Sequence, residues 1–285
     1  MAEQQALFDR QAVQRGRARA VKQGPALFLH EDALFEVQER LIDVNRAFTK
    51  IAIVTGFPGF WADAFPTATV VPDADVLNLD AAAHDLVIHA MCLHSANDPV
   101  GQLVQCRRAL MADGLCLVAM LGGQTLVELR QALGAAEIAV TDGLSPRVAP
   151  MAEIRDLGAL LQRAGFALPV ADSTPRTVSY RSVLHLMRDL RAMGEANPLD
   201  ARQKNFSKRD LFAEAARIYE DIFTLPDGTV RATFEMIFLT GWAPDASQQK
   251  PLRPGSALTR LADVLNTTEL GADAKPVRGT EDQRR

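Results

Sequence analysis

Cysteine is scarce in this chain, and its few residues exclude several kinds of protein. The three cysteines, Cys92, Cys106 and Cys116, are widely spaced and form no C-x-x-C pair. An odd, scattered set indicates neither a disulfide framework nor a zinc knuckle. We interpret the three side chains as small buried groups in a reducing compartment, and we expect a cytoplasmic protein.

Aromatic residues and charge of one sign are also sparse. Aromatic residues make up 6% of the chain, and 31 basic side chains against 35 acidic ones leave a net charge of −4. A mildly acidic chain with few stacking rings is a poor nucleic-acid binder, so we exclude that class. No stretch of about 18 consecutive apolar residues is present, and we therefore expect no membrane span.

The Arg-rich segment at residues 1–20 lacks the apolar core of a secretory signal, and we expect an amphipathic helix there. Its arginines are placed on a solvated helix face, which is the usual position for such a run. They are Arg10, Arg15, Arg17 and Arg19.

Common catalytic and metal-binding motifs are missing. There is no G-x-S-x-G turn, no P-loop and no H-E-x-x-H, which disfavours the hydrolase and kinase classes that use them. His84, His89 and His94 are five residues apart. Residues at that spacing point to opposite faces of a strand, and no acidic or cysteine cluster completes a site, so we expect no metal centre.

What the chain does have is a globular composition, with 48% hydrophobic and 23% charged residues. Residues 50–133 alternate between short apolar runs and helical spacing, which predicts an open parallel sheet with helices on both faces. The expected strands are 50–55, 85–91 and 115–121, and the expected helices are 98–111 and 126–133. Asp98 and Pro99 make a sound helix start, and Asp113-Gly114 is predicted to end that helix.

The later half is organised differently, with two helices expected before a last, long strand. The expected helices are 152–164, 182–193 and 208–223, the last with Ser207 as N-cap, and the expected strands are 166–170 and 232–242. Two helices between these strands would let the final strand return antiparallel. We predict one domain over 1–245 with a helical insertion at about 181–223. Residues 246–285 are expected to form a polar, mobile tail with a short helix near 257–265.

In an open α/β sheet the ligand lies beyond the carboxyl ends of the strands. Here those ends are followed by Thr55–Gly59, His89–Ser95 and Gly122–Thr125. Gly56 and Gly59 would let a ligand approach the backbone, but Pro58 lacks an N–H group and Phe57 is bulky. The turn is therefore either a ligand cradle or a bare structural turn. His94 either touches a ligand or is an ordinary loop histidine.

A set of short motifs runs through the chain in a fixed order, over about residues 8–243. These motifs are Phe8-Asp9-Arg10, Leu93-His94 with Asn97-Asp98, Gly122-Gly123-Gln124-Thr125-Leu126-Val127-Glu128-Leu129-Arg130, Ser145-Pro146 through Pro150, Asp156-Leu157-Gly158, Arg163-Ala164-Gly165-Phe166, Leu186-Met187 with Asp189-Leu190, Met193-Gly194-Glu195 and Gly241-Trp242. They resemble the class I S-adenosylmethionine-dependent methyltransferases. Within these, they are similar to the mitochondrial respiratory complex I assembly factors with a methyltransferase fold and their proteobacterial relatives.

The resemblance implies a Rossmann-like methyltransferase sheet of six or seven strands, mostly parallel with an antiparallel last strand. It implies S-adenosylmethionine as cofactor and a protein client, which in the mitochondrial members is a complex I subunit hydroxylated on an arginine. It assigns no catalytic residue. The cofactor-binding residues that it implies are Thr55, Gly56, Gly59, Asp80, Met91, Leu93 and His94.

The chain departs from the family at the first glycine turn. Where the family has D-x-G-x-G-x-G, Ile53 replaces the acidic residue, Thr55 and Phe57 replace two glycines, and Gly59 is kept. The stretch from Trp61 to Asp85 is short. It barely accommodates a second strand ending in the acidic residue that, in the family, holds the ribose of the cofactor. The candidates for that acid are Asp73, Asp75 and Asp80.

Two functions follow from these observations. The first is an S-adenosylmethionine-dependent enzyme that uses the turn Gly56–Gly59 and modifies a protein client. The second is a non-catalytic assembly or binding scaffold that has lost the cofactor and grips its client with the carboxyl-terminal half. Under the second reading, several motif residues of that half serve structure or partner contact. These are Arg130, Arg147, Arg163, Met193-Gly194-Glu195 and Trp242.

Overall fold

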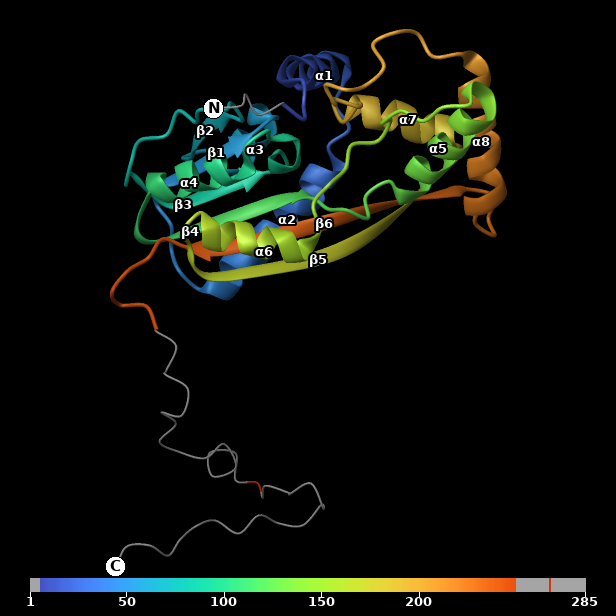
Figure 1. Cartoon of the computed structure of the whole chain (residues 1–285). Helices are drawn as coiled ribbons and strands as arrows, with labels where there is room; N and C mark the ends of the chain where they lie inside the picture. Colours follow the sequence, from blue (N-terminus) through green and yellow to red (C-terminus); the bar gives the residue numbers. More distant parts are fainter. Residues whose placement is uncertain (1–5, 250–266, 268–285) are drawn as a thin grey trace, which may run out of the picture. The chain divides into compact units, whose positions relative to one another are not determined.

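The computed structural model describes residues 6–249 and residue 267. The chain divides into two units, Met1–Asp245 and Ala246–Arg285. Apart from 246–249 and 267, the second unit lies outside the described residues, and so does the helix predicted near 257–265. The first unit is a layered α/β domain (Figure 1).

The described residues form a six-stranded sheet in the order β2-β1-β3-β4-β6-β5. The strands are β1 Ile51–Thr55, β2 Thr69–Pro72, β3 His84–Ala90, β4 Leu110–Leu121, β5 Ala167–Tyr180 and β6 Val230–Trp242. The first four pair in parallel, and β6 pairs antiparallel with both β4 and β5. This confirms the predicted Rossmann-like methyltransferase sheet with an antiparallel last strand.

Helices cover both faces of this sheet. They are α1 Arg10–Gln23, α2 Phe28–Val44, α3 Pro58–Ala64, α4 Pro99–Ala109, α5 Val127–Thr141, α6 Ile154–Arg163, α7 Val183–Ala192 and α8 Arg209–Phe223, with a 3-10 turn η1 at Leu93–Ser95. Alternate residues of the buried strands pack into two separate cores. Ile53 and Leu117 face α2, α5, α7 and α8, whereas Val54 and Val118 face α4 and α6. Strands buried on both faces explain the continuous apolar runs in the sequence.

The start of α4 is as predicted, but its end is not. The Asp98 carboxylate accepts from the Gly101 N–H at 2.7 Å, and Pro99 occupies the first turn. The helix ends at Ala109, however, and Asp113 lies inside β4 with a positive φ of 57°. The strand begins early because Leu110 already pairs with His84 of β3.

Two further expectations about the later half are corrected. Ser207 is not the N-cap of α8, because its hydroxyl accepts from Arg147 and Lys208 stands at the cap. Strand β5 continues to Tyr180, ten residues beyond the predicted end at Val170. Its outer part is a strand because it pairs along its length with β6. Pro175 is tolerated there since β5 is the edge strand.

Candidate functional site

The carboxyl ends of the parallel strands meet at one edge of the sheet, as predicted. Thr55 pairs with Ala90 and Ala90 with Ala119, so β1, β3 and β4 end side by side. The pairing of β3 with β4 extends one residue further, because the Met91 N–H donates to the Ala119 carbonyl at 2.8 Å. Beyond it, His94 Nδ1 accepts from the Leu121 N–H at 3.4 Å. The residues expected to surround a ligand are therefore neighbours in space.

Helix α1 lies against this edge and is fastened by the first motif of the sequence. The Phe8 backbone exchanges two hydrogen bonds with the Asn97 side chain, at 2.8 and 3.0 Å. Asp9 caps the helix by accepting from the Ala12 N–H at 2.9 Å. Arg10 reaches the Ser95 carbonyl at 3.0 Å. The Phe8-Asp9-Arg10 motif thus holds α1 on the loop that follows β3.

Two glycines let α1 approach the Met193-Gly194-Glu195 turn closely. A Cβ atom on Gly16 would lie 3.1 Å from the Gly194 carbonyl oxygen. Gly194 has a φ of +77°, and a Cβ atom there would lie 3.1 Å from the Arg17 Cα. A side chain at either position would press on the opposite segment, so glycine on both sides favours this close contact.

Arg17 crosses directly over the glycine turn after β1. A Cβ atom on Gly56 would lie 2.6 Å from the Arg17 Cδ, Nε and Cζ atoms. The Arg17 Nη1 atom binds Asp73 Oδ2 at 2.6 Å, and Nη2 donates to the Ser95 hydroxyl at 3.2 Å. Arg17 is only 5% exposed, which corrects its expected place on a solvated helix face.

Asp73 is the first residue after β2, and its Oδ2 atom is bound within the chain. Arg10 Nη2 binds the same Asp73 oxygen as Arg17, at 3.0 Å. Burial alone would lower the pKa of Arg17, but the nearby carboxylates of Asp73 and Glu195 raise it, so the guanidinium stays charged. Of the three acidic candidates, Asp73 occupies the strand end, while Asp75 and Asp80 are exposed in the following loop.

The glycine turn itself is closed on its inner side. Phe57 is 4% exposed, and its ring lies 4.8 Å from the His30 ring, centroid to centroid. The Phe57 N–H donates to the Thr55 hydroxyl at 3.2 Å. Gly59, in contrast, has open space where a Cβ atom would be.

We call the turn Gly56–Gly59 and the ends of β1 and β2 the cradle, and its residues do not fit S-adenosylmethionine as arranged here. The family's cofactor needs open backbone at the turn and a free acid after the second strand. In this chain the Arg17 side chain covers Gly56, and Asp73 is neutralised by two arginines. A ligand that contacts the Gly56 backbone on the side of Arg17 would have to displace this side chain from Asp73.

His94 and Glu195 form a second side-chain pair beside the cradle, in which the Glu195 side chain is 20% exposed. The His94 Nε2 atom lies 3.3 Å from Glu195 Oε2, and the His94 side chain is 3% exposed. Burial would raise the pKa of Glu195, but His94 and Arg17 lower it to about 2, so the carboxylate is ionised. His94 is therefore held by the Met193-Gly194-Glu195 motif. It is also part of the wall of a cavity.

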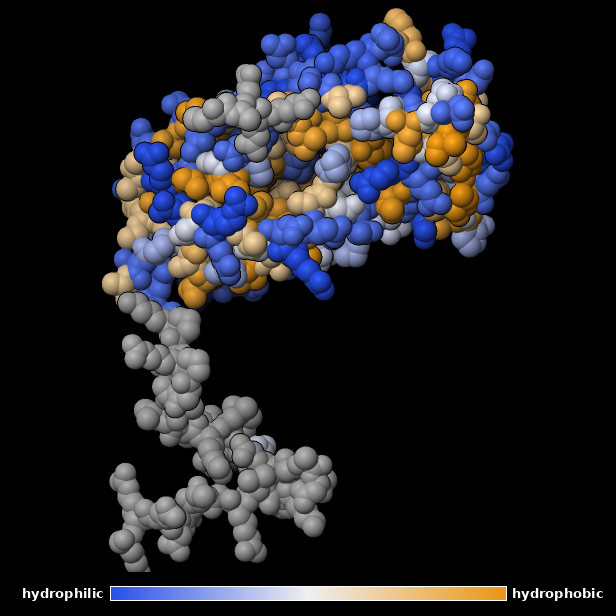
Figure 2. Space-filling view, in the orientation of Figure 1, coloured by the Kyte–Doolittle hydropathy of each residue, from blue (hydrophilic) through white to orange (hydrophobic). Residues whose placement is uncertain are grey.

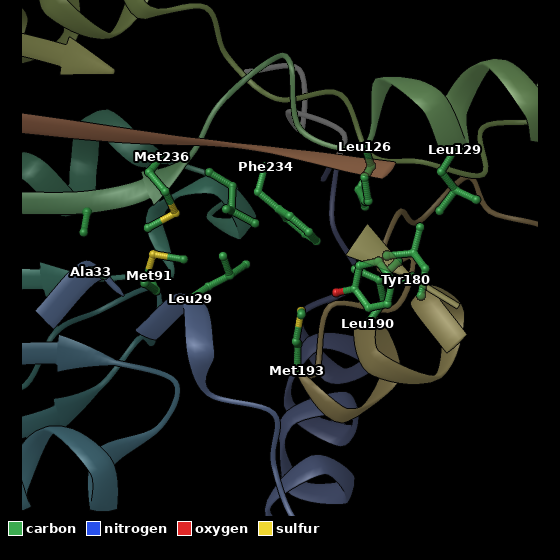
Figure 3. Packing of buried hydrophobic residues seen from close by; sticks show 14 of the residues in the cluster. Leu29, Ala33, Met91, Leu126, Leu129, Tyr180, Leu190, Met193, Phe234 and Met236 are labelled. Atoms are coloured by element: carbon green, nitrogen blue, oxygen red, sulfur yellow. The ribbon is translucent and has the colours of Figure 1, made fainter. Parts of the chain in front are cut away.

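That cavity has a volume of about 350 Å³, and most of its wall consists of loop residues within 145–151 and 193–203 together with side chains from α5 and α7. Figure 3 shows five of its apolar lining residues, Leu126, Leu129, Leu190, Met193 and Phe234, which converge on one region. The surrounding surface is hollowed and carries hydrophobic residues near the middle of the domain (Figure 2). Our sequence reasoning missed this cavity. Its signal was the pair of motifs at Ser145–Pro150 and Leu186-Met187, several of whose residues line the wall.

Other sequence expectations have the following outcomes. The three cysteines are free and buried, and burial raises the pKa of the Cys92 thiol. Within the part of the chain that the structure describes, no three His, Cys, Asp or Glu side chains are grouped for a metal ion. None of the described helices is both long enough and apolar enough to pass through a bilayer.

Comparison with known proteins gives relatives but no matching family model. The mitochondrial arginine-hydroxylase NDUFAF5 of Danio rerio is 38% identical over 208 residues, 73% of this chain and 64% of that protein. The malonyl-[acyl-carrier protein] O-methyltransferase of Laribacter hongkongensis is 34% identical over 188 residues, 66% of this chain and 61% of that protein. This chain thus spans less than two thirds of the length of either relative.

A solved structure of a Bacillus halodurans protein with a methyltransferase name aligns with a TM-score of 0.46. The two are 14% identical, and the alignment covers 73% of this chain and 98% of that one. The sequence relatives confirm the resemblance that the motifs indicated.

Proposed function

From its relation to the NDUFAF5 proteins and to methyltransferases, we propose that this methyltransferase-like chain is a non-catalytic assembly factor. It binds a protein client, a subunit of respiratory complex I, without holding S-adenosylmethionine in the cradle. The single observation that carries the proposal is the Arg17 side chain, which lies over Gly56 and pairs with Asp73. A cytoplasmic location is part of the same proposal.

The energetics of the Arg17–Asp73 pair support a closed cradle. Both side chains are almost fully buried, at 6% and 7% side-chain exposure. Breaking a buried ion pair costs about 3–5 kcal/mol when it leaves an uncompensated charge, and the cost here is at the lower end because Arg10 would still pair with Asp73. A cofactor that had to displace Arg17 would therefore lose affinity by about two orders of magnitude.

The client surface is supported by exposed apolar side chains in the carboxyl-terminal half. Ile138 and Leu144 are exposed on or just after α5, and Phe206 and Phe212 are exposed at the start of α8. Helices α5 and α8 pack together, and Figure 2 shows hydrophobic residues gathered at that end of the domain. Clustered exposed apolar residues mark protein interaction sites.

An enzyme that modifies its client is the second candidate. It is favoured by the 38% identity to a protein named arginine-hydroxylase and by the open space at Gly59. In this reading helix α1 would leave the cradle when the cofactor binds.

Calorimetric titration of the full chain with S-adenosylmethionine separates the two candidates. We expect no heat of binding at millimolar cofactor, with circular dichroism showing that the protein is folded. Micromolar binding that a Gly59→Trp variant abolishes would overturn the proposal in favour of the enzyme.

The client is tested separately by affinity purification of the full chain under mild salt. We expect a complex I subunit to co-purify, and the Gly59→Trp variant to retain it equally well. Substitution of the exposed residues, as in Phe206→Ser with Leu144→Ser, is expected to release it. Recovery of no such subunit would contradict the assembly role.

A further inference from the structure

The wall of the cavity beside the cradle has two polar regions, which we call its inner and outer ends. At the inner end, His94 and Glu195 lie by the carboxyl ends of β3 and β4. At the outer end, Arg147 binds Glu137 of α5.

The size and lining of the cavity suit a small, mainly apolar ligand. Its volume is about 350 Å³, at the lower end of the range of small-molecule sites. Three methionines, Met151, Met187 and Met193, are among the wall residues. Methionine adapts to irregular apolar shapes, so such walls accept a flexible alkyl chain.

The outer end has cationic groups and a donor without an acceptor. Arg147, Arg191 and Arg202 all line the cavity. The buried Arg147 Nε atom has no hydrogen-bond partner among the described residues, although Nη2 binds Glu137 at 2.6 Å. Arg202 is paired with Asp9, and Arg191 is exposed with no described ion-pair partner. A buried donor left unpaired is costly, and a carboxylate oxygen would satisfy it.

The inner end differs from the outer end, because its carboxylate is already paired and would not attract a cationic group of a ligand. The Glu195 carboxylate is already paired with His94 and lies near the charged Arg17. We propose that the cavity binds a linear medium-chain monocarboxylate, with its alkyl chain against α5 and α7 and its carboxylate at Arg147 and Arg191. This site is independent of the client proposed above, and it persists if the assembly role fails.

The charge preference is tested with three ten-carbon probes in calorimetric titrations of the full chain: decanoate, decanol and decylamine. We expect decanoate to bind with a stoichiometry of one. Decanol is expected to bind about tenfold more weakly or worse, because it lacks the charge-assisted hydrogen bond. Decylamine binding as well as decanoate, or a decanoate stoichiometry well above one, would overturn the proposal.

The location is tested with variants that have matched controls. Met187→Trp fills the cavity and is expected to abolish decanoate binding, whereas Leu184→Trp, on the exposed side of the same helix, is expected to leave it unchanged. Decanoate binding that survives Met187→Trp would contradict the assigned site.

The role of the arginine is tested by a paired substitution. Arg147→Gln alone would leave buried Glu137 without its cation, so Glu137→Gln is combined with it. This double variant is expected to weaken decanoate binding at least about tenfold while binding decanol normally. Arg217→Gln, on the exposed face of α8, is the control. Unchanged decanoate affinity in a folded double variant would exclude Arg147 as the carboxylate partner.

Discussion

The cradle and the cavity lie at the same edge of the sheet but satisfy their polar groups in opposite ways. In the cradle, Arg17, Asp73 and Ser95 bind one another, and the glycine turn is covered. In the cavity, the Arg147 Nε atom is left without a partner, and apolar walls enclose empty space. Of the two regions, the cavity is therefore the one with a buried polar group that a ligand could satisfy.

The comparison also shows what the family motifs do in this chain. The Phe8-Asp9-Arg10 and Met193-Gly194-Glu195 motifs both position α1 against the cradle. They are therefore compatible with a chain that binds no cofactor there. A motif match of this kind supports the fold more strongly than the chemistry.

The largest effect is expected from removing the cation that closes the cradle. Arg17→Ala should lower the free energy of unfolding by about 3 kcal/mol, because buried Asp73 loses its closer partner and keeps only Arg10. Urea denaturation measures this. Arg15→Ala, on the exposed side of α1, should cost less than about 1 kcal/mol. Equal effects of the two substitutions would show that the closure contributes nothing to stability.

A second effect concerns pH and the histidines packed around the cradle. Burial lowers the pKa of both His30 and His89 from 6.5 to about 4. Between pH 6.5 and about pH 4, these two histidines are therefore mostly protonated in the unfolded chain but mostly neutral in the folded chain. The free energy of unfolding should be steady above pH 6.5 and fall by about 3 kcal/mol per histidine as the pH drops to 4.

Urea denaturation at several pH values measures this fall, with His30→Gln as the test variant and His185→Gln, exposed on α7, as the control. The test variant should have a shallower slope, and the control should not. Below pH 4.5 a further decrease is expected down to about pH 2, since the pKa of Glu195 is lowered to about 2. A flat profile between pH 6.5 and 4 would contradict neutral buried histidines.

A smaller effect isolates the contact between α1 and the Met193-Gly194-Glu195 turn. Gly194 and Gly228 have similar positive φ angles, 77° and 82°, but only Gly194 is crowded, by Arg17. Alanine should cost about 1–2 kcal/mol of backbone strain at either site. Gly194→Ala should cost about 1–3 kcal/mol more from overpacking. Thermal unfolding of both variants measures the difference, and equal losses would mean that α1 is not pressed against the turn.

The smallest expected effect lies outside both regions and calibrates the others. Asp98→Ala removes the N-cap of α4 and should cost about 1 kcal/mol, whereas Asp98→Asn should keep most of the cap. Decanoate binding should be unchanged in both. A loss of several kcal/mol in urea denaturation would indicate a role for Asp98 beyond capping.

The parallel part of the fold could be predicted because its signals are local. Apolar runs, glycine turns and the Asp98-Pro99 start are visible within a few residues of one another. The outer half of β5 could not, since residues 172–179 are mostly polar and include Pro175, and they form a strand through their pairing with β6. Its length depends on residues about 60 positions later in the chain.

The position of the candidate site could be predicted from the sequence, but the covering of its glycine turn by Arg17 could not. The strand ends, the glycine turn and His94 do lie together, as the topology required. Arg17 covers the turn through its contact with Asp73, which is far from it in sequence. The local pattern around Arg17 is that of an amphipathic helix, and it predicted only a solvated arginine. The available signal was Gly16, a glycine inside a helix, which often marks close packing.

The most direct test of the closed cradle is a crystal structure of the full chain grown with millimolar S-adenosylmethionine. We predict the Arg17 guanidinium on Asp73, with no cofactor density over Gly56. Cofactor density in that place, with α1 displaced and Asp73 facing the ribose, would contradict the account.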